Sequence, residues 1–592
     1  MHTKTPFSYY SSRIEALRET EKKIASRLSR YSFSRLIVFV VTAFAGYYFY
    51  NGFLSLVLTL VPGISIFLWL VSRYNDLRYH HKKTKKLIAI NENELQILDG
   101  RYEHQPTGAH FTHDLHFYSK DIDLFGKGSF FQYLNRTELP AGSKKLAELL
   151  TENATEQITE KQESVKELAQ LPEWRQEYQA VASLINVETT SEEVIEWINR
   201  YKPFTRKYYH KIALVFTVVS LLMLLFYFLG YLPGNSVFFW FLAGLGISGF
   251  HLKKSNLLSE NVSKIRGVFD QYAKLVNLVE TFRFQSDELK EKAAFITGKD
   301  ENASAILRKF SKLLDSFDQR NNMIFGVLAN GFFLWDLYYT HRIEYWISHY
   351  QKDLTHWFET IAVFDAWNSL GNFAFNHPGY VYPEIIKEGK TIIHAEACSH
   401  PLLDPAMSVS NTIYIENQGF HIITGANMAG KSTFLRTVAL HIVMANSGLP
   451  VCASSSLYRP VQLITSMRTS DSLSDNESYF FSELKRLKQV VEAVQKGPCF
   501  VILDEILKGT NSTDKAIGSR KFIEKLVSLG ATGIVATHDL SLCVLEDKLP
   551  QIKNYYFDAE IVDGELFFDY RLKKGICKNM NASFLLKKME IV

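Results

Sequence analysis

The sequence has few cysteines and no strong excess of either charge. No two of its five cysteines form a C-x-x-C pair, and none stands near a histidine at zinc-site spacing: Cys398, Cys452, Cys499, Cys543 and Cys577. This pattern argues against a disulfide framework or a zinc site and is typical of thiols in a reducing compartment. The 66 basic and 62 acidic residues leave a net charge of +4. No strongly basic tail therefore indicates a nucleic-acid partner, and any such contact would need a local patch.

Low-complexity tracts are also absent, and the only internal repetition is a pair of apolar hairpins. At 592 residues the chain is too long for a single hydrophobic core, and about three or four domains are expected. Residues 1–33 are charged and amphipathic. They are too long a leader for a cleavable signal peptide, and no small-residue cleavage site follows the apolar segment. We expect 1–33 to be a cytoplasmic N-terminal segment.

The first apolar pair consists of residues 36–50 and 53–71, joined only by Asn51-Gly52. The second run has the length of a membrane span, and the first is shorter. Basic residues flank the pair and the turn carries no charge, so the positive-inside rule places both ends in the cytoplasm. The sequence predicts a transmembrane hairpin over 34–73. A buried hairpin of a soluble protein is the alternative, disfavoured because apolar positions surround each helix.

The second apolar pair consists of residues 211–232 and 236–252. Basic residues again flank both ends but not the turn, which predicts a second transmembrane hairpin over 206–252. Its last run is the weakest of the four because it is short and rich in glycine. Gly244 and Ser248 are spaced to share one helix face, where small residues allow a close contact between helices. With four predicted spans, we expect a multi-pass protein of the cell (inner) membrane.

The segments between and after the hairpins have a helical pattern. Residues 87–205 and 255–385 are predicted to form an all-α core, the second part being its lever and return. Ile122–Leu150 has helical spacing broken at Pro140-Ala141-Gly142, and a second helix is expected over Ile158–Leu171.

Two further regions differ from this helical pattern: an apolar stretch near residue 335 and the C-terminal third of the chain. Met323–Tyr350 is apolar, but Asp336, His341, Arg342 and Glu344 interrupt it. We therefore predict one long core helix rather than a membrane-lying one. From about residue 390, short β-like runs alternate with helices, so 390–592 is predicted to be an α/β domain.

The α/β part opens with a G-x-x-x-x-G-K-S motif between an apolar strand and a helical pattern. In this context backbone N–H groups of the loop bind phosphate, the lysine reaches the β/γ oxygens and the serine ligates Mg²⁺. The alternative is a chance glycine-rich turn. It is disfavoured because such a turn would not be expected between a strand and a helix. The predicted nucleotide-binding residues are Gly425, Ala426, Asn427, Met428, Ala429, Gly430, Lys431, Ser432 and Thr433.

Two further strand ends carry residues suited to hydrolysis. Cys499–Ile506 is an apolar strand ending in Asp504-Glu505, where the aspartate can hold Mg²⁺ and the glutamate can polarise the attacking water. Gly533–Asp539 places His538 at the corresponding end of another strand, where open α/β sheets bind ligands and a histidine can position a phosphate. The plainer alternatives are an acidic pair that caps a strand and a structural histidine.

Together these segments resemble the ATPase domain of the MutS family. The matching segments are TGANMAGKSTFLRT for Walker A, DSLSDNESYFFSE for the signature, LDEILKGTNSTD for Walker B and its loop, and ATHD for the histidine switch. They occur in the family's order and spacing, and Lys574-Gly575 lies in a tail that resembles the family's ending. Leu134–Leu146 and Phe364–Phe375 resemble the entry to and return from the family's helical core. The resemblance covers about 120–592, interrupted by the second hairpin.

The resemblance implies a P-loop ATPase of the MutS/ABC type that uses ATP and Mg²⁺. In this family two subunits enclose the nucleotide, so a homodimer is implied and Ser478 would meet the partner's γ-phosphate. A serine before a helix is also an ordinary N-cap, and the two roles are compatible. The implied catalytic residues are Lys431, Glu505 and His538, and the implied Mg²⁺ ligands are Ser432 and Asp504.

The chain also departs from the family pattern. An apolar hairpin stands where the mismatch-reading domain would precede the core, and no Phe-x-Glu wedge is found. Asn476 and Glu477 replace the usual glycine and arginine of the signature, and Glu477 would bring a negative charge close to the nucleotide interface.

Three functions are compatible with these features. The first is a membrane-anchored MutS-like ATPase that engages DNA as a dimer. The second is a dimeric membrane ATPase that acts on envelope components without DNA. The third, a half-transporter, is disfavoured because no LSGGQ-type signature appears and the predicted spans carry almost no polar groups. Basic clusters at 78–86 and 202–211 fit either DNA or anionic lipid.

Overall fold

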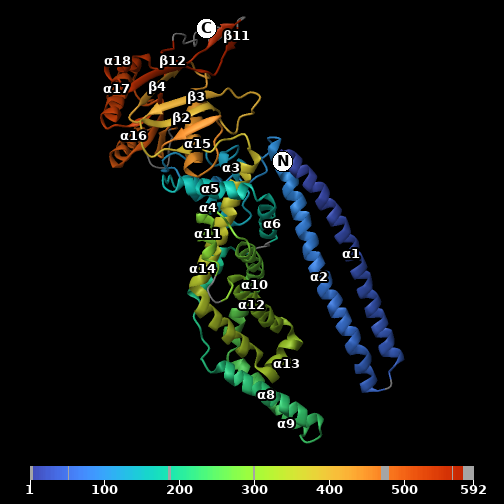
Figure 1. Ribbon diagram of the computed structural model, residues 1–592. Coiled ribbons are helices and arrows are strands. Elements are labelled where there is room, and N and C mark those ends of the chain that lie inside the picture. The colour runs from blue at the N-terminus through green and yellow to red at the C-terminus, as the bar shows by residue number, and fades with distance from the viewer. Residues whose placement is uncertain are drawn as a thin grey trace.

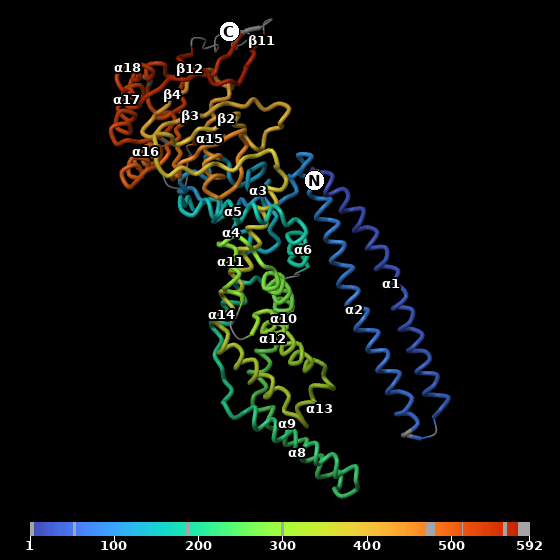
Figure 2. Tube along the Cα trace, viewed as in Figure 1, coloured from blue at the N-terminus to red at the C-terminus, as the bar shows by residue number. Residues whose placement is uncertain are grey.

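The computed structural model describes residues 5–50, 52–184, 189–297, 301–468, 479–562 and 565–577. Figure 1 shows an elongated molecule with an α/β part at one end, a column of helices below it and a long hairpin beside the column. Figure 2 traces the same path along the chain. The architecture is mixed helical and α/β, as the sequence predicts.

The helical part precedes the α/β part in the chain. Its helices are α1 (Pro6–Tyr48), α2 (Phe53–Leu98), α3 (Phe130–Leu134), α4 (Pro140–Thr151), α5 (Ile158–Ala169), α6 (Pro172–Ala182), α7 (Ser191–Arg200), α8 (Tyr209–Phe228), α9 (Gly234–Phe250), α10 (Leu252–Thr281), α11 (Asp287–Ala294), α12 (Ala303–Asp318), α13 (Met323–Phe333) and α14 (Trp335–Asn376).

The first hairpin is formed by α1 and α2, which are 43 and 46 residues long. Both continue as helix well beyond the apolar runs, and α1 includes the predicted N-terminal segment from Pro6 onward. Ion pairs stabilise these charged extensions, within α1 between Lys23 and Glu19 and across the hairpin between Arg18 and Glu92.

The second hairpin is formed by α8 and α9. Within the described residues, α1, α2 and α8 are each long and apolar enough to cross a membrane, and a fourth candidate arises only if α9 is combined with α10, to which it is bent by 68°. In Figure 1 the turns of both hairpins lie at the end of the molecule away from the α/β part. The two apolar pairs thus project in the same general direction.

The predicted close contact at Gly244 and Ser248 is confirmed, and its partner is α13. A Cβ on Gly244 would lie 2.1 Å from the carbonyl oxygen of Gly331. The Ser248 hydroxyl lies 3.5 Å from the carbonyl oxygen of Asn330. Small residues on both helices therefore let α9 and α13 approach backbone to backbone.

The prediction of one helix over Met323–Tyr350 is wrong, because the chain breaks at Leu334 between α13 and α14. Leu334 adopts a left-handed conformation with φ 49° and is fully buried. The side chain of Asn330 accepts a hydrogen bond from the backbone N–H of Asp336 at 3.0 Å, which satisfies a donor in the first turn of α14. Burial and capping together stabilise the break.

The prediction for Ile122–Leu150 is also partly wrong. Only α3 and α4 are helical there, and Pro140 begins α4 instead of breaking a helix, as its fixed φ allows in a first turn. The carboxylate of Asp365 on α14 accepts hydrogen bonds from the N–H groups of Glu138 and Leu139. The predicted helix over Ile158–Leu171 is confirmed as α5, which ends two residues earlier.

The α/β part contains two sheets and the helices around them. Its elements are β1 (Glu384–Ile385), β2 (Thr391–Cys398), β3 (Asn411–Glu416), β4 (Phe420–Gly425), α15 (Lys431–Asn446), β5 (Ser455–Tyr458), β6 (Gln462–Ser466), α16 (Tyr479–Lys496), β7 (Cys499–Asp504), α17 (Ser512–Ser528), β8 (Thr532–Ala536), α18 (Leu545–Lys548), β9 (Ile552–Phe557), β10 (Glu560–Val562), β11 (Glu565–Phe567) and β12 (Leu572–Lys574).

The larger sheet has the order β12-β9-β4-β8-β7-β6 in the described part of the chain. Its strands are parallel except for β12 at one edge. The second sheet, β1-β5-β2-β3, shares one hydrophobic core with α15, whereas α16 and α17 contribute to the core on the other face of the larger sheet. The helix α15 is therefore buried between sheets, which explains why its apolar residues surround it.

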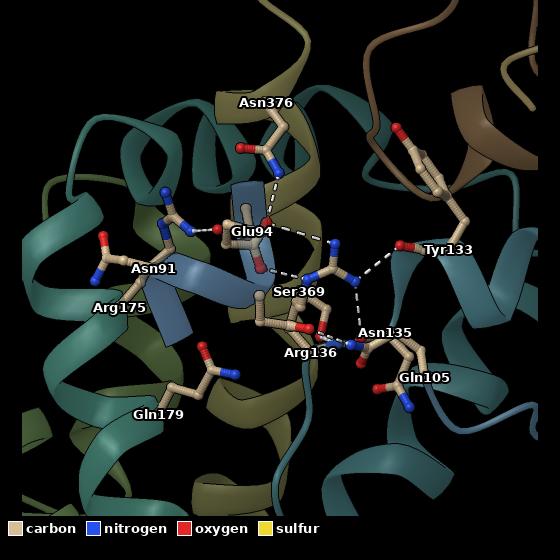
Figure 3. Close-up of polar contacts among 12 residues, drawn as sticks. Asn91, Glu94, Gln105, Tyr133, Asn135, Arg136, Arg175, Gln179, Ser369 and Asn376 are labelled. Atoms are coloured by element: carbon tan, nitrogen blue, oxygen red, sulfur yellow. Dashed lines mark hydrogen bonds and ion pairs between the residues drawn. The ribbon is translucent and has the colours of Figure 1, made fainter. Parts of the chain in front are cut away.

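A buried ion pair attaches the first hairpin to the column (Figure 3). The side chains of Arg136 and Glu94 are 5% and 2% exposed, with 2.5 Å between Nε and Oε1. Glu94 also accepts a hydrogen bond from the Asn376 amide at 2.8 Å, and the backbone N–H of Arg136 donates to the Ser369 hydroxyl at 3.0 Å. Tyr10 of α1 donates to Asn376 at 2.7 Å. Both helices of the hairpin thus meet the end of α14 at one polar cluster.

Replacing Glu94 with glutamine is expected to loosen the inner end of α2, because Arg136 would keep a buried charge without a counter-ion. Breaking one partner of such a pair costs about 3–5 kcal/mol. Hydrogen exchange of the purified chain in detergent should show this loss of protection over residues 87–98.

The matched control is Glu92→Gln on the same helix, which removes a partly exposed pair with Arg18 and should cost less than about 1 kcal/mol. Equal exchange in the two variants would show that the buried pair does not hold α2 in place.

Candidate nucleotide site

The phosphate-binding motif forms the loop between β4 and α15. Its backbone has positive φ at Gly425, Met428 and Gly430, with values of 150°, 67° and 101°. A Cβ on Gly425 would approach the carbonyl oxygen of Phe557 to 2.7 Å, so this position has no room for a side chain. The loop leads directly into the first turn of α15. There the backbone N–H groups lack helical partners, and the helix dipole favours an anion.

Lys431 occupies the interior of this loop. Its Nζ donates hydrogen bonds to the carbonyl oxygens of Gly425 at 2.9 Å and Ala426 at 2.8 Å. Burial lowers the pKa of Lys431, and the nearby carboxylates of Asp504 and Glu505 oppose that shift. The loop thus holds an ammonium group where a bound phosphate would meet it.

Ser432 and Asp504 form the pair predicted to hold Mg²⁺. The Ser432 hydroxyl donates to Oδ2 of Asp504 at 2.6 Å. Among the described residues, no group of three or more histidine, cysteine, aspartate or glutamate side chains could hold a metal alone. The pair fits Mg²⁺ well, because this ion is commonly held by one or two carboxylates together with substrate phosphates.

Glu505 and His538 lie beside this pair because their strands are neighbours. Asp504 on β7 is in register with Ala536 on β8, two residues before His538. Nε2 of His538 lies 3.8 Å from Oε1 of Glu505 and 3.3 Å from Nζ of Lys431. Burial and the Lys431 ammonium lower the pKa of His538, which favours its neutral form near pH 7.

These side chains line one cavity of about 760 Å³. The predicted residues that line it are Asn427, Met428, Gly430, Lys431, Ser432, Thr433, Asp504, Glu505 and His538. The carbonyl oxygens of Gly425 and Ala426 accept the hydrogen bonds from Lys431, and Ala429 is buried in the loop. The predicted signature residue Ser478 lies outside the described residues.

Residues 421–588 match the family model described as MutS domain V. The human MutS protein homolog 4 is 31% identical over 250 residues, which are 39% of this chain and 25% of that protein. The DNA mismatch repair protein MutS of Bacillus subtilis is 32% identical over 204 residues, or 33% of this chain and 23% of that protein.

These matches support MutS family membership. The DNA mismatch repair protein MutS of Methanosarcina mazei is 28% identical over 340 residues, covering 56% of this chain and 33% of that protein. The chain thus spans about a quarter to a third of the length of these curated relatives. The match to MutS domain V begins inside β4, one residue after its start, and includes the loop, both carboxylates and His538.

The MutS domain V region also contains a residue of the site that our motif reading missed, Glu483 on α16. Its carboxylate is 2% exposed and accepts hydrogen bonds from the backbone N–H groups of Leu507 at 2.6 Å and Lys508 at 3.3 Å. Glu505 and Leu507 both have positive φ, 51° and 60°. Glu483 therefore stabilises an unfavourable backbone conformation directly after β7.

A sequence signal for Glu483 was present. It shares a helix stripe with Leu487, Val490 and Val494, which are all buried, and a carboxylate on an apolar stripe needs a partner. A second missed residue is Tyr570, whose ring would lie 3.1 Å from a Cβ on Gly430 and which lines the cavity. Nothing in its local pattern indicates that position.

Replacing Glu483 with glutamine is expected to weaken the protection of the Leu507 and Lys508 amides from hydrogen exchange. A hydrogen bond to a charged acceptor contributes about 1.5–3 kcal/mol, so exchange should accelerate roughly 10- to 100-fold. The variant Glu492→Gln on the exposed face of α16 is the control. Unchanged protection in Glu483→Gln would mean that the loop holds its shape without this carboxylate.

Proposed function

We propose that the chain is a membrane-anchored ATPase that binds Mg²⁺–ATP in this cavity and hydrolyses it. The observation that carries the proposal is the convergence of Lys431, Ser432, Asp504, Glu505 and His538 on one cavity at the carboxyl edge of a parallel sheet. Ligands of open α/β sheets bind at this edge.

Each side chain has a role that its position supports. Lys431 and the first N–H groups of α15 would bind the β- and γ-phosphates, Lys431 through an ammonium already inside the loop. Ser432 and Asp504 would hold Mg²⁺, which when bound neutralises charge between the β- and γ-phosphates. Glu505 lies next to this pair and would orient and polarise the attacking water, and neutral His538 would contact the γ-phosphate.

Lysine side chains flank the proposed catalytic carboxylate. Nζ of Lys508 and of Lys515 each lie 3.8 Å from a Glu505 oxygen, on opposite oxygens. They hold the carboxylate in place and add positive charge near the developing phosphate charge. Apolar and aromatic residues also line the cavity, Leu403, Val409 and Tyr570 among them, and would accommodate the base.

The rim of the cavity and the family resemblance support a homodimer in this proposal. Met428 and Met407 line the cavity but remain 77% and 82% exposed. Exposed apolar side chains around a functional site mark a surface that a partner covers. In the proposed dimer, Ser478 of one subunit would complete the other subunit's site.

The exposed apolar surface of the two hairpins supports the proposed membrane anchoring. In the apolar part of α1, Leu36, Phe39 and Phe44 are each about 60% exposed, and in water so much exposed apolar surface is unfavourable. By the positive-inside rule, the basic residues at the base of both hairpins support a cytoplasmic location of the α/β part at the inner membrane in this proposal.

The variant Lys431→Ala is expected to bind ATP roughly 10- to 100-fold more weakly, since a hydrogen bond from a charged donor contributes about 1.5–3 kcal/mol. Equilibrium binding of a fluorescent ATP analogue to the full chain in lipid nanodiscs measures this. Lys525→Ala, an exposed lysine of α17, is the matched control. Equal affinities in both variants would refute the assignment of the phosphate site.

The variant Glu505→Gln is expected to bind ATP but turn it over roughly 100- to 10,000-fold more slowly, the usual contribution of a general base. With Mg²⁺–ATP it should accumulate as a dimer in light scattering. Glu388→Gln, an exposed carboxylate of the same part, should behave like the unaltered chain. Normal turnover in Glu505→Gln would remove this residue as the base.

Engagement of DNA is the finer part of the proposal, and its support is the match to proteins named for DNA mismatch repair. The alternative is action on envelope components. One observation supports this alternative. Two lysines of the 78–86 cluster already have carboxylate partners, Lys83 with Glu177 and Lys85 with Glu21, so they are less available to DNA phosphates.

The trapped Glu505→Gln dimer separates these alternatives. Its binding to homoduplex, mismatched and branched DNA is measured over a salt series, because phosphate contacts make affinity fall steeply with salt. A steep loss supports DNA engagement. A flat response, or no binding at low salt, supports the envelope function.

A further inference from the structure

A second cavity lies at the foot of the helical column, far along the chain from the nucleotide site. It has a volume of about 450 Å³ and is enclosed by α8, α12 and α14. Leu214, Ile306, Phe310 and Trp346 form an apolar wall, and the rings of Phe310 and Trp346 are stacked with centroids 3.7 Å apart. This size is within the usual range of small-molecule sites, about 300–1,000 Å³.

The apolar wall is continuous with the surface proposed to face lipid. Leu214 belongs to α8, one of the helices long and apolar enough to span a membrane. The next outward positions, Val215 and Val218, are 60% and 49% exposed. Lys207 and Lys211 stand at the start of the same helix. The cavity thus lies where the apolar part of α8 meets its basic end, the level of the membrane interface.

A cation lies at the polar rim of the cavity. The Arg342 guanidinium donates to the Tyr338 hydroxyl at 3.3 Å and has no carboxylate partner within the described residues. Lys309 also lines the rim but is paired with Glu301. The ring of His210 is stacked on that of His341, with centroids 5.0 Å apart. Arg342 is therefore the charge at this rim that remains available to an anion.

One further donor on the wall lacks a partner. Trp346 is 7% exposed, and its indole N–H has no hydrogen-bond partner among the described residues. Tyr338, Tyr345 and Tyr350 add aromatic side chains with polar tips around the same cavity. Such side chains concentrate at membrane interfaces, where one end is apolar and the other hydrated.

We propose that this cavity binds one anionic phospholipid from the surrounding bilayer. Its acyl chain would lie along the wall of Leu214, Ile306, Phe310 and Trp346, and its phosphate would pair with Arg342. The inference rests on the membrane anchoring proposed above. The site is separate from the nucleotide cavity, but α14 runs from its wall to the cluster that holds Glu94, so occupancy can act on the hairpin and the α/β part together.

Quenching of tryptophan fluorescence by brominated lipids tests the proposal. The full chain is reconstituted in nanodiscs that contain a small fraction of phosphatidylglycerol or phosphatidylcholine with brominated acyl chains. The difference between the unaltered chain and Trp346→Phe isolates the signal of Trp346. We expect phosphatidylglycerol to be about fivefold more effective, the factor that one cation near an anionic lipid contributes.

Variants of the rim and the wall give the controls. Arg342→Gln should remove the preference for phosphatidylglycerol, Arg342→Lys should retain it, and Arg283→Gln, an exposed arginine of the column, should leave it unchanged. Ile306→Phe, which fills the cavity, should reduce quenching by both lipids. Equal quenching by the two lipids in the unaltered chain, or a preference that survives Arg342→Gln, would overturn the proposal.

Flotation of the same preparations with vesicles distinguishes failure of this site from failure of the anchoring. A chain that floats but shows no Trp346-dependent quenching is anchored without a lipid in this cavity, which refutes the inference alone. A chain that does not float refutes the anchoring and the inference with it.

Discussion

The structure depends on one buried pair of charges, Glu94 and Arg136. Neither can be left alone in the interior, because an unpaired buried charge costs several kcal/mol. Since Glu94 lies near the end of α2 and Arg136 follows α3, their pairing fixes where the first hairpin joins the column. Asn376 at the end of α14 shares the same carboxylate, and the chain continues from there into the α/β part. The first hairpin and the chain that leads into the α/β part are therefore both attached at the Glu94 cluster.

At the other end, the arrangement of the nucleotide site follows from the sheet. Three neighbouring parallel strands, β4, β8 and β7, end at one edge and carry the loop, His538 and the carboxylates. The neighbouring strands bring Asp504 and His538 to the same edge, and the loop after β4 holds Lys431 there. Glu483 adds a constraint from α16, the helix that follows the signature segment, by binding the backbone after Glu505. A single side chain thus links α16 to the backbone that follows Glu505, the proposed catalytic carboxylate.

The features that could be predicted from the sequence are those whose structure depends on residues nearby in the chain. The stretch from Gly425 to Ser432 and the strand ending in Asp504 are short local patterns, and the structure has β4, α15 and β7 where these patterns place a strand, a helix and a strand. Features that need distant partners could not be predicted. The break at Leu334 depends on the burial of its side chain in a cluster with Ala213 and Phe216 of α8, and the Glu94–Arg136 pair joins residues 42 positions apart. Ion pairs between the charged parts of α1 and α2 stabilise both extensions, and these pairs are not visible in either helix alone.

The central claim is that both hairpins enter one bilayer from the side that carries the α/β part and return to it. Labelling with a membrane-impermeant maleimide tests it most directly, in a background in which the partly exposed Cys452 is replaced by serine. Single cysteines replace Tyr50 and Tyr231 at the two hairpin turns and Glu388 in the α/β part. In sealed vesicles with the cytoplasmic face outward, the account predicts labelling at 388 and, only after permeabilisation, at 50 and 231. Labelling of either turn together with 388 in sealed vesicles would contradict it.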